Sequence, residues 1–327
     1  MHILITGAAG MLGRKLAAAL AQGAPVGGRR ATRLTLADVV MPDPVPPLPA
    51  ERLAVDLGDP ATAPALVAAR PDLIVHLAAI VSGEAEADFD KGYRVNLDGT
   101  RALLEAIRAE GARAPWCPRV VFASSLAVFG APFPARIDDT FFLTPLTSYG
   151  TQKAMGELLL DDYSRRGFLD GVGLRLPTIC IRPGAPNKAA SGFFSGILRE
   201  PLAGQPAVLP VGTDVRHWFA SPRAATGFLL HAAGIDSAAL GHRRSLTMPG
   251  VSATVGDQIE ALRRVAGDRA VALITHRPDP VIAAIVAGWP RDFDTARATS
   301  LGFVAETAFD QIIRAHIEDE LGGVLPG

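Results

Sequence analysis

The sequence predicts an α/β fold in which a doubly wound parallel sheet is followed by a smaller, C-terminal substrate domain. Three observations predict it. Glycines directly follow the first apolar run, short apolar runs alternate with helical stretches up to about residue 180, and this regularity ends after Arg182. Such alternation is typical of a parallel sheet that is covered by helices on both faces.

The first strand is expected at His2–Thr6 and the first helix at Met11–Gln22, where Leu and Ala recur at helical spacing. A second strand at Leu34–Ala37 ends at Asp38, and the prolines of 41–49 predict a loop. The other elements expected in this half are strands at Leu53–Val55, Asp72–Leu77, Val120–Ala123 and Val172–Leu176, a helix capped by Asp59 and opened by Pro60, and helices at Asn96–Ala109 and Tyr149–Tyr163. Together they predict a Rossmann arrangement.

Two domains are expected from the change in regularity. Residues 1–180 are predicted to form the Rossmann domain, and 181–327 mainly the substrate domain. Parts of 215–245 and 280–300 are expected to return and complete the first domain.

The bulk composition narrows the class of partner. The chain has 327 residues with 32 Lys and Arg against 33 Asp and Glu, which gives no general attraction to nucleic acid or anionic membranes. Cys117 and Cys180 lie far apart without neighbouring Cys or His pairs, which predicts neither a disulfide framework nor a metal site. No apolar run approaches the roughly 20 residues that span a bilayer. A cytoplasmic enzyme with a small-molecule partner is expected.

The glycines at 7, 10 and 13 follow the first strand and open the first helix. Without side chains, the backbone N–H groups of such a turn can approach a pyrophosphate at the helix N-terminus. A glycine-rich turn without a ligand is the alternative, but the flanking strand and helix favour a dinucleotide site.

Asp38 ends the second strand about 20 residues further on, where a carboxylate can accept hydrogen bonds from both adenosine ribose hydroxyls. This favours NAD over NADP as the cofactor. The alternative is a solvent-facing aspartate, with a 2′-phosphate bound by the nearby Arg29, Arg30 and Arg33.

Tyr149 and Lys153 are four residues apart, which places a phenol and an amine on one face of a helix. A tyrosine has a reference pKa of about 10, so a neighbouring cation is needed to favour the phenolate. A phenolate of this kind can remove a proton from a substrate hydroxyl. Such a pair also occurs by chance on surface helices, so it gains weight only from the motifs around it.

With Ser125 and the glycine turn, the pair resembles the extended short-chain dehydrogenase/reductase family, also called the epimerase/dehydratase family, over nearly the whole chain. The resemblance implies an NAD-dependent oxidoreductase that forms a homodimer through Rossmann-domain helices. It implies that Tyr149, Lys153 and Ser125 are catalytic, with Ser125 bonding the reacting oxygen and Ser124 as a second candidate. The NAD contacts implied by the resemblance and by the patterns above are Gly7, Gly10, Met11, Leu12, Gly13, Asp38, Asp56, Leu57, Leu77, Ala78, Ala79, Asn96, Tyr149, Lys153, Pro177 and Thr178.

The chain also departs from the family pattern. Phe129 stands where many members have Tyr, and 217–220 replace a usually polar run, which argues against a nucleotide-sugar substrate. Leu126 and Ala127 occupy the places where sugar dehydratases of the family carry an Asp-Glu pair. Neither can transfer a proton, so a dehydratase is disfavoured.

The stretch from Arg175 to Gly192, which includes 182–188, together with Ser124 to Gly130, resembles a group within this family that oxidises the C2 hydroxyl of D-erythronate-like sugar acids. A small acid needs cationic or amide donors for its carboxylate. The substrate residues expected are Ser124, Ser125, Arg182, Asn187, Lys188 and Arg216. Arg182 and Lys188 could instead be solvated loop charges, and His217 is expected to pack or face solvent.

Two other functions stay open on the sequence. One is an epimerase or reductase that acts on a nucleotide sugar, which would need a second diphosphate pocket in the C-terminal domain. The other is a regulator that senses the dinucleotide without turnover, which the intact Tyr149 and Lys153 argue against.

Overall fold

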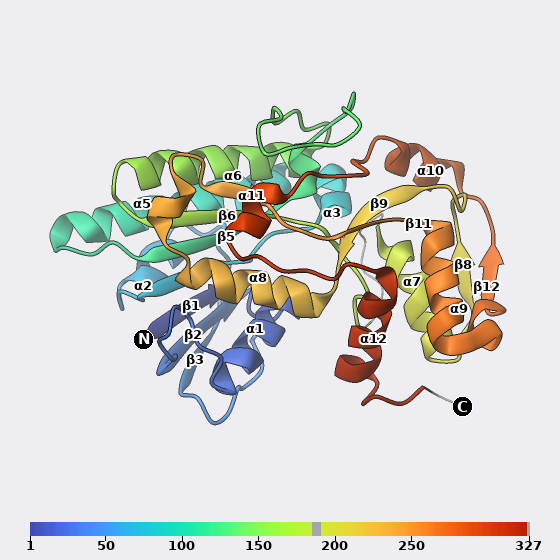
Figure 1. Cartoon of the computed structure of the whole chain (residues 1–327). Coiled ribbons are helices and arrows are strands. Elements are labelled where there is room, and N and C mark those ends of the chain that lie inside the picture. The colour runs from blue at the N-terminus through green and yellow to red at the C-terminus, as the bar shows by residue number, and fades with distance from the viewer. Residues whose placement is uncertain (185–190, 326–327) are drawn as a thin grey trace.

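The computed structural model describes residues 1–184 and 191–325. Its centre is a parallel seven-stranded sheet in the order β10-β6-β5-β4-β1-β2-β3 (Figure 1). The strands are β1 (His2–Thr6), β2 (Arg33–Asp38), β3 (Ala50–Ala54), β4 (Leu73–His76), β5 (Arg119–Ser125), β6 (Asp170–Leu176) and β10 (Ser245–Thr247). The predicted doubly wound α/β fold is confirmed.

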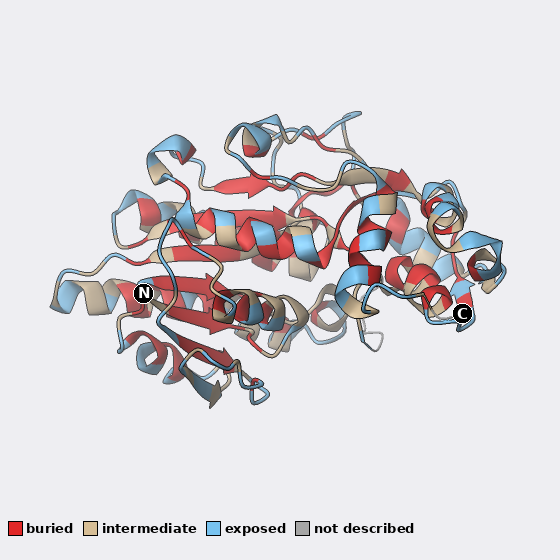
Figure 2. Cartoon of the chain, turned by 60° about the horizontal axis from the view of Figure 1, so that its bottom comes forward, coloured by how far each residue is buried: buried red, intermediate tan, exposed pale blue. Residues whose placement is uncertain are grey.

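Successive residues of each central strand serve two different cores, because side chains alternate across a strand. Ile3 and Ile5 of β1 pack with α1 (Met11–Ala21), α8 (Pro222–Gly234) and α11 (Ala296–Ser300) on one face. Leu4 packs on the other face with α2 (Thr62–Val67), α5 (Gly99–Arg113) and α6 (Ser148–Arg165). The inner strands of the sheet are therefore buried on both sides, which explains why they are nearly continuous apolar runs (Figure 2).

Several boundaries differ from the sequence-based expectation, among them those of β3 and α2. The third strand is Ala50–Ala54 rather than Leu53–Val55, because it pairs with β2 from Leu34 onward. The helix expected from Asp59 and Pro60 begins only at Thr62: the Asp59 carboxylate accepts the Ala61 N–H in a turn before it.

Short elements connect β4 to α5. They are α3 (Ser82–Ala87), α4 (Phe89–Gly92) and a π-helical turn at Tyr93–Asp98, which runs directly into α5. A 3₁₀ turn at Leu126–Val128 follows β5. Both stretches lie at the carboxyl edge of the sheet, where ligands bind in folds of this type.

The second core has its own elements. Strands β7 (Thr178–Ile179), β9 (Arg216–Ala220) and β11 (Val251–Thr254) form one small sheet, and β8 (Ala207–Leu209) pairs with β12 (Ile274–His276). Its helices are α7 (Gly192–Leu202), α9 (Val255–Val271), α10 (Pro280–Ala287) and α12 (Phe309–Glu320). These elements of the second core lie at one end of the large sheet (Figure 1). The 3₁₀ turn at Ser237–Leu240, which leads to β10, belongs to the first core.

The returning segments divide between the two cores. From the region around 215–245, α8 packs against α1 and β10 extends the large sheet, whereas β9 belongs to the small sheet. From 280–300, Ala298 of α11 lies in the first core, and Val286 of α10 lies in the second.

Candidate active site

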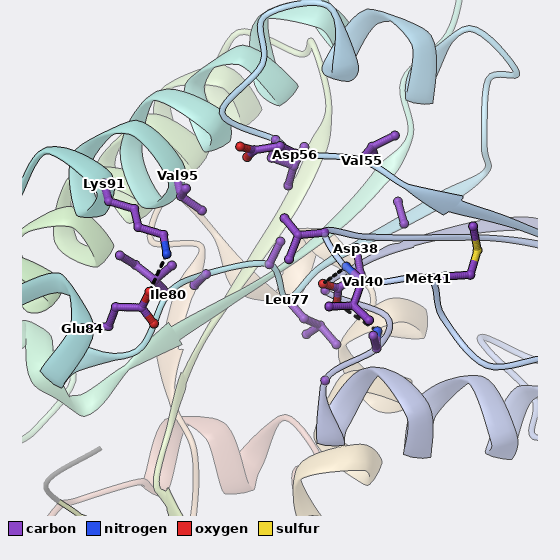
Figure 3. Close-up of a pocket in the computed structure, with 18 of the residues that line it drawn as sticks. Asp38, Val40, Met41, Val55, Asp56, Leu77, Ile80, Glu84, Lys91 and Val95 are labelled. Carbon is purple, nitrogen blue, oxygen red and sulfur yellow. Dashed lines mark hydrogen bonds and ion pairs between the residues drawn. The ribbon is translucent and has the colours of Figure 1, made fainter. Parts of the chain in front are cut away.

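A cavity of about 730 Å³ opens at the carboxyl ends of β1, β2 and β4 (Figure 3). Eight residues expected to contact the cofactor line it: Gly7, Gly10, Asp38, Asp56, Leu57, Leu77, Ala78 and Ala79. The cavity thus joins the glycine turn, the end of β2 and the segment after β4. Met11, Leu12 and Gly13 do not line it and form the first turn of α1 behind the glycines.

The glycine turn leaves no space for side chains. Gly7 has φ +73°, and a Cβ on it would lie 2.6 Å from the Ala78 nitrogen. A Cβ on Gly13 would lie 2.4 Å from the Gly7 carbonyl oxygen. The first turn of α1 therefore abuts β1 and the segment after β4, with its N–H groups at the cavity edge. This cradle fits a pyrophosphate.

Asp38 lies at the cavity wall, where its Oδ2 accepts the Ala9 N–H at 2.9 Å (Figure 3). Two of the three arginines that could have bound a 2′-phosphate are paired elsewhere: Arg33 with Glu51 and Arg29 with Asp72. A carboxylate at this point fits the ribose hydroxyls and repels an added phosphate.

The Asp38→Ala variant is therefore expected to relax the choice of cofactor. We expect KM for NAD to rise by about tenfold, because an adenosine ribose contact is lost, while KM for NADP falls. Steady-state kinetics with each cofactor measure both. An unchanged ratio of kcat/KM for NAD and NADP would show that Asp38 does not select the cofactor.

Thirteen lining residues were not expected from the sequence. They are Ala9, Arg14, Ala37, Val39, Val40, Met41, Asp43, Val55, Ile80, Glu84, Lys91, Arg94 and Val95. Most belong to segments 39–43 and 80–95, which fold over the opening without a period that sequence inspection can detect. Two of the cations are paired with carboxylates that also line the cavity: Lys91 with Glu84 at 2.5 Å and Arg94 with Asp56 at 2.7 Å.

Asn96 lies behind the cavity rather than in its wall. It is buried, accepts the Ile80 N–H at 2.8 Å, and donates to the Ile80 carbonyl and to Gln152. It therefore holds the segment after β4 against α6.

Tyr149 lies in the first turn of α6, which begins beside the end of β5. The Thr147 hydroxyl caps this helix by accepting the Gly150 N–H, and a Cβ on Gly150 would lie 2.1 Å from the Ala127 carbonyl oxygen. Burial raises the pKa of Tyr149, whereas a hydrogen bond with Ser125 and the charge of Arg182 lower it. Residues from β5, α6 and the segment after β7 thus meet at one phenol.

Lys153 lies one turn further along α6 and is buried. Its Nζ donates to the Ala123 carbonyl at 2.8 Å and lies 5.8 Å from the centre of the Tyr149 ring. Burial lowers the pKa of Lys153 to about 8, against the opposing charge of Glu157. The Lys153 amine therefore lies near the Tyr149 ring, as the four-residue spacing predicted.

The two serines at the end of β5 face opposite sides, because side chains alternate along a strand. Ser125 bonds Tyr149 and also accepts the Ala127 N–H at 3.2 Å. Ser124 is buried and donates to Glu157 at 2.5 Å. The expectation that Ser124 contacts the substrate is corrected, since its hydroxyl lies in the interface between β5 and α6.

The expected carboxylate donors have different surroundings. Arg182 is half-buried, its charge lowers the pKa of Tyr149, and its Nε donates to the Ile179 carbonyl at 3.1 Å. Asn187 and Lys188 lie outside the described residues. Arg216 is exposed, and its guanidinium contacts Ser252 and Asp257. Arg182 is thus the donor that the structure brings to Tyr149.

Pro177 and Thr178 directly follow β6. The last residue of β6, Leu176, pairs with Ser125 of β5. The Thr178 hydroxyl bonds His217 Nε2 at 2.7 Å, and His217 Nδ1 lies 2.9 Å from the Pro290 carbonyl. Burial lowers the pKa of His217 to about 4, so the ring is neutral and its Nδ1–H donates to Pro290. His217 packs, as expected, and turns the Thr178 side chain toward the second core.

Residues 3–243 match the model of the NAD dependent epimerase/dehydratase family. The chain belongs to this family. It is an NAD-dependent oxidoreductase, as the sequence predicted, and its cofactor is NAD, which the glycine turn and Asp38 fit. An oxidoreductase function replaces the alternative of a regulator that senses the dinucleotide without turnover.

Three relatives of this epimerase-family chain are informative. It is 48% identical to the D-erythronate dehydrogenase of Cupriavidus necator over 98% of each chain. It is 42% identical to the D-erythronate dehydrogenase of Haemophilus influenzae over 98% of this chain and 100% of the relative. The crystal structure of the nucleoside-diphosphate-sugar epimerase from Agrobacterium tumefaciens matches with TM-score 0.97 and 61% identity, over 100% of this chain and 96% of that one.

Two further findings concern the described part of the epimerase-family chain. In these residues no three His, Cys, Asp or Glu side chains come together as a metal site would require. Within the same ranges, no helix combines the length and the apolar character needed to cross a membrane.

Proposed function

We propose that this oxidoreductase uses NAD to oxidise the C2 hydroxyl of a small sugar acid, D-erythronate or a close relative, to the 2-oxo acid. The observation that carries the proposal is the half-buried guanidinium of Arg182, whose positive charge lowers the pKa of the Tyr149 phenol. A carboxylate bound by Arg182 would hold the neighbouring carbon and its hydroxyl close to Tyr149. The two relatives named D-erythronate dehydrogenase, which match over nearly the full chain, support this substrate class.

Each residue of the site has a role in the proposed reaction. The Tyr149 phenolate accepts the proton of the C2 hydroxyl, and Ser125 donates a hydrogen bond to the reacting oxygen. Lys153 favours the phenolate through its positive charge. The glycine turn and Asp38 would hold NAD, which would supply the acceptor for the hydride that leaves C2. Asn187, Lys188 and Arg216 remain proposed as further donors to the acid.

An epimerase or reductase of nucleotide sugars is the second candidate. The observation in its favour is the high identity to the solved structure from Agrobacterium tumefaciens that bears an epimerase name. The proposed sugar-acid reaction rests instead on Arg182, whose charge suits a carboxylate next to the reacting carbon.

We further propose that the protein acts in the cytoplasm as a homodimer.

The test is NAD reduction across four- to six-carbon hydroxy acids, with UDP-glucose and UDP-galactose assayed in parallel for epimerisation. We expect turnover of one or a few acids, D-erythronate among them, and none of the nucleotide sugars. Absorbance of the reduced cofactor follows the acids, and chromatography follows the sugars. Conversion of a nucleotide sugar with no acid oxidised would replace the proposal by the second candidate.

A further inference from the structure

Four titratable side chains follow one another along α6 at intervals of four residues: Tyr149, Lys153, Glu157 and Asp161. This spacing places them on one face of the helix. The face packs on β5 and β6, so the stripe leads from the phenol into the protein interior. The proposed reaction uses the first two groups and leaves Glu157 without a role.

Glu157 is buried and fully engaged by polar partners. Arg175 donates from Nε to both carboxylate oxygens at 3.0 Å and from Nη2 to one of them at 2.8 Å. The Ser124 hydroxyl donates to the same carboxylate. A carboxylate that is bound in this two-point ion pair carries its negative charge inside the protein.

The other groups that face Lys153 bring no compensating charge. His76 of β4 is held between the Thr6 and Thr100 hydroxyls, and burial lowers the pKa of His76 to about 3, so its ring is neutral. The Phe122 ring and the Ala123 carbonyl of β5 offer only a π-face and a dipole. Arg175 of β6 is a like charge, but it lies against Glu157.

Beyond Glu157, the helix carries a weaker acid. Burial raises the pKa of Asp161 to about 6, and the charge of Glu157 adds to that effect. Asp161 is also two helical turns from Lys153. Among the described residues, Glu157 is therefore the negative group placed to offset the burial of the Lys153 ammonium.

We propose that Glu157 is a positioning residue of the site: its buried carboxylate, paired with Arg175, keeps Lys153 protonated in a water-poor site. Lys153 can then act as the cation that favours the Tyr149 phenolate. This inference rests on the proposed function only for the use of that cation, since the charge of Lys153 itself can be measured without substrate or NAD. An opposite charge within about 4–6 Å shifts a titration by about one to three pH units.

The experiment titrates Lys153 directly in the full chain, without cofactor, by NMR of lysine labelled with ¹³C at Cε. The lysines of the chain are Lys15, Lys91, Lys153 and Lys188, so a Lys153→Met variant assigns the signal by its loss. We expect Glu157→Gln to lower the midpoint of the Lys153 signal by about one pH unit or more. Ser124→Ala keeps the carboxylate and its charge, and should leave the midpoint unchanged.

Glu157→Gln also removes the two-point partner of the buried Arg175 and leaves it the Asp139 carboxylate, 4.0 Å from its Nη1, which destabilises the fold. A second variant, Glu157→Gln with Arg175→Met, removes both charges and is expected to shift the midpoint in the same direction by less. Wild-type midpoints in both Glu157 variants would overturn the inference. The proposed function fails on a different result, conversion of a nucleotide sugar with no acid oxidised, so the two outcomes are distinguishable.

Discussion

Replacing Tyr149 by phenylalanine is expected to lower kcat for acid oxidation by about 10²–10⁴-fold, the range that a positioned acid–base group contributes. The substitution removes one oxygen atom and leaves the ring against Lys153, so the fold and the NAD cavity should persist. Single-turnover measurements of NAD reduction give the loss. Isothermal titration with NAD should show binding within a few fold of the wild type.

The chain offers a control for this variant. It has only three tyrosines, Tyr93, Tyr149 and Tyr163, so ultraviolet titration of the phenolate can isolate Tyr149 by difference. Tyr163→Phe changes another phenol, which bonds Glu105 on the outer side of α6, and should leave turnover unchanged. Comparable rates in Tyr149→Phe and the wild type would remove Tyr149 from the mechanism.

Replacing Arg182 by methionine is expected to lower kcat/KM for the acid by about 10²–10³-fold. Loss of one partner from a buried charge pair costs about 2–5 kcal/mol, and here the lost partner is the proposed carboxylate ligand. The variant also removes a positive charge that lowers the pKa of Tyr149. Because the phenolate is the reactive form, the rising limb of the pH–rate profile should move to higher pH.

A matched control separates substrate binding from general loss of charge. Arg263→Met removes an exposed guanidinium on α9 that pairs with Glu260 and Asp268, and kcat/KM should stay within about twofold. The uncharged alcohol erythritol, which lacks the carboxylate, should be a poor substrate for the wild type and for Arg182→Met alike. An Arg182→Met enzyme with wild-type KM for the acid would place the carboxylate site elsewhere.

Local patterns predicted much of the site because its main parts are set by short-range geometry. The glycines after β1 and the four-residue spacing of Tyr149 and Lys153 are each fixed within one or two turns of chain, and the structure places them as expected. Ser124 was the residue misjudged on the same strand. Adjacent serines look alike in sequence, and only the direction of strand β5 against α6 decides which one meets the phenol.

Residues brought in from distant segments could not be predicted in this way. Lys91, Arg94 and segment 39–43 reach the NAD cavity because short helical turns and a loop fold over its opening, and such short pieces show no hydrophobic period. Arg175 gave no sign of its partner Glu157 either, because β6 and α6 meet only when the sheet assembles.

The sequence by itself therefore determined the layered α/β fold, the dinucleotide turn and the phenol–ammonium pair, because each depends on periodicity or spacing within one element. Tertiary structure alone decided which serine faces the phenol, that Arg182 rather than Arg216 lies beside it, and that Glu157 is buried under Lys153. These are contacts between elements far apart in the chain, and their distances and burial exist only after packing.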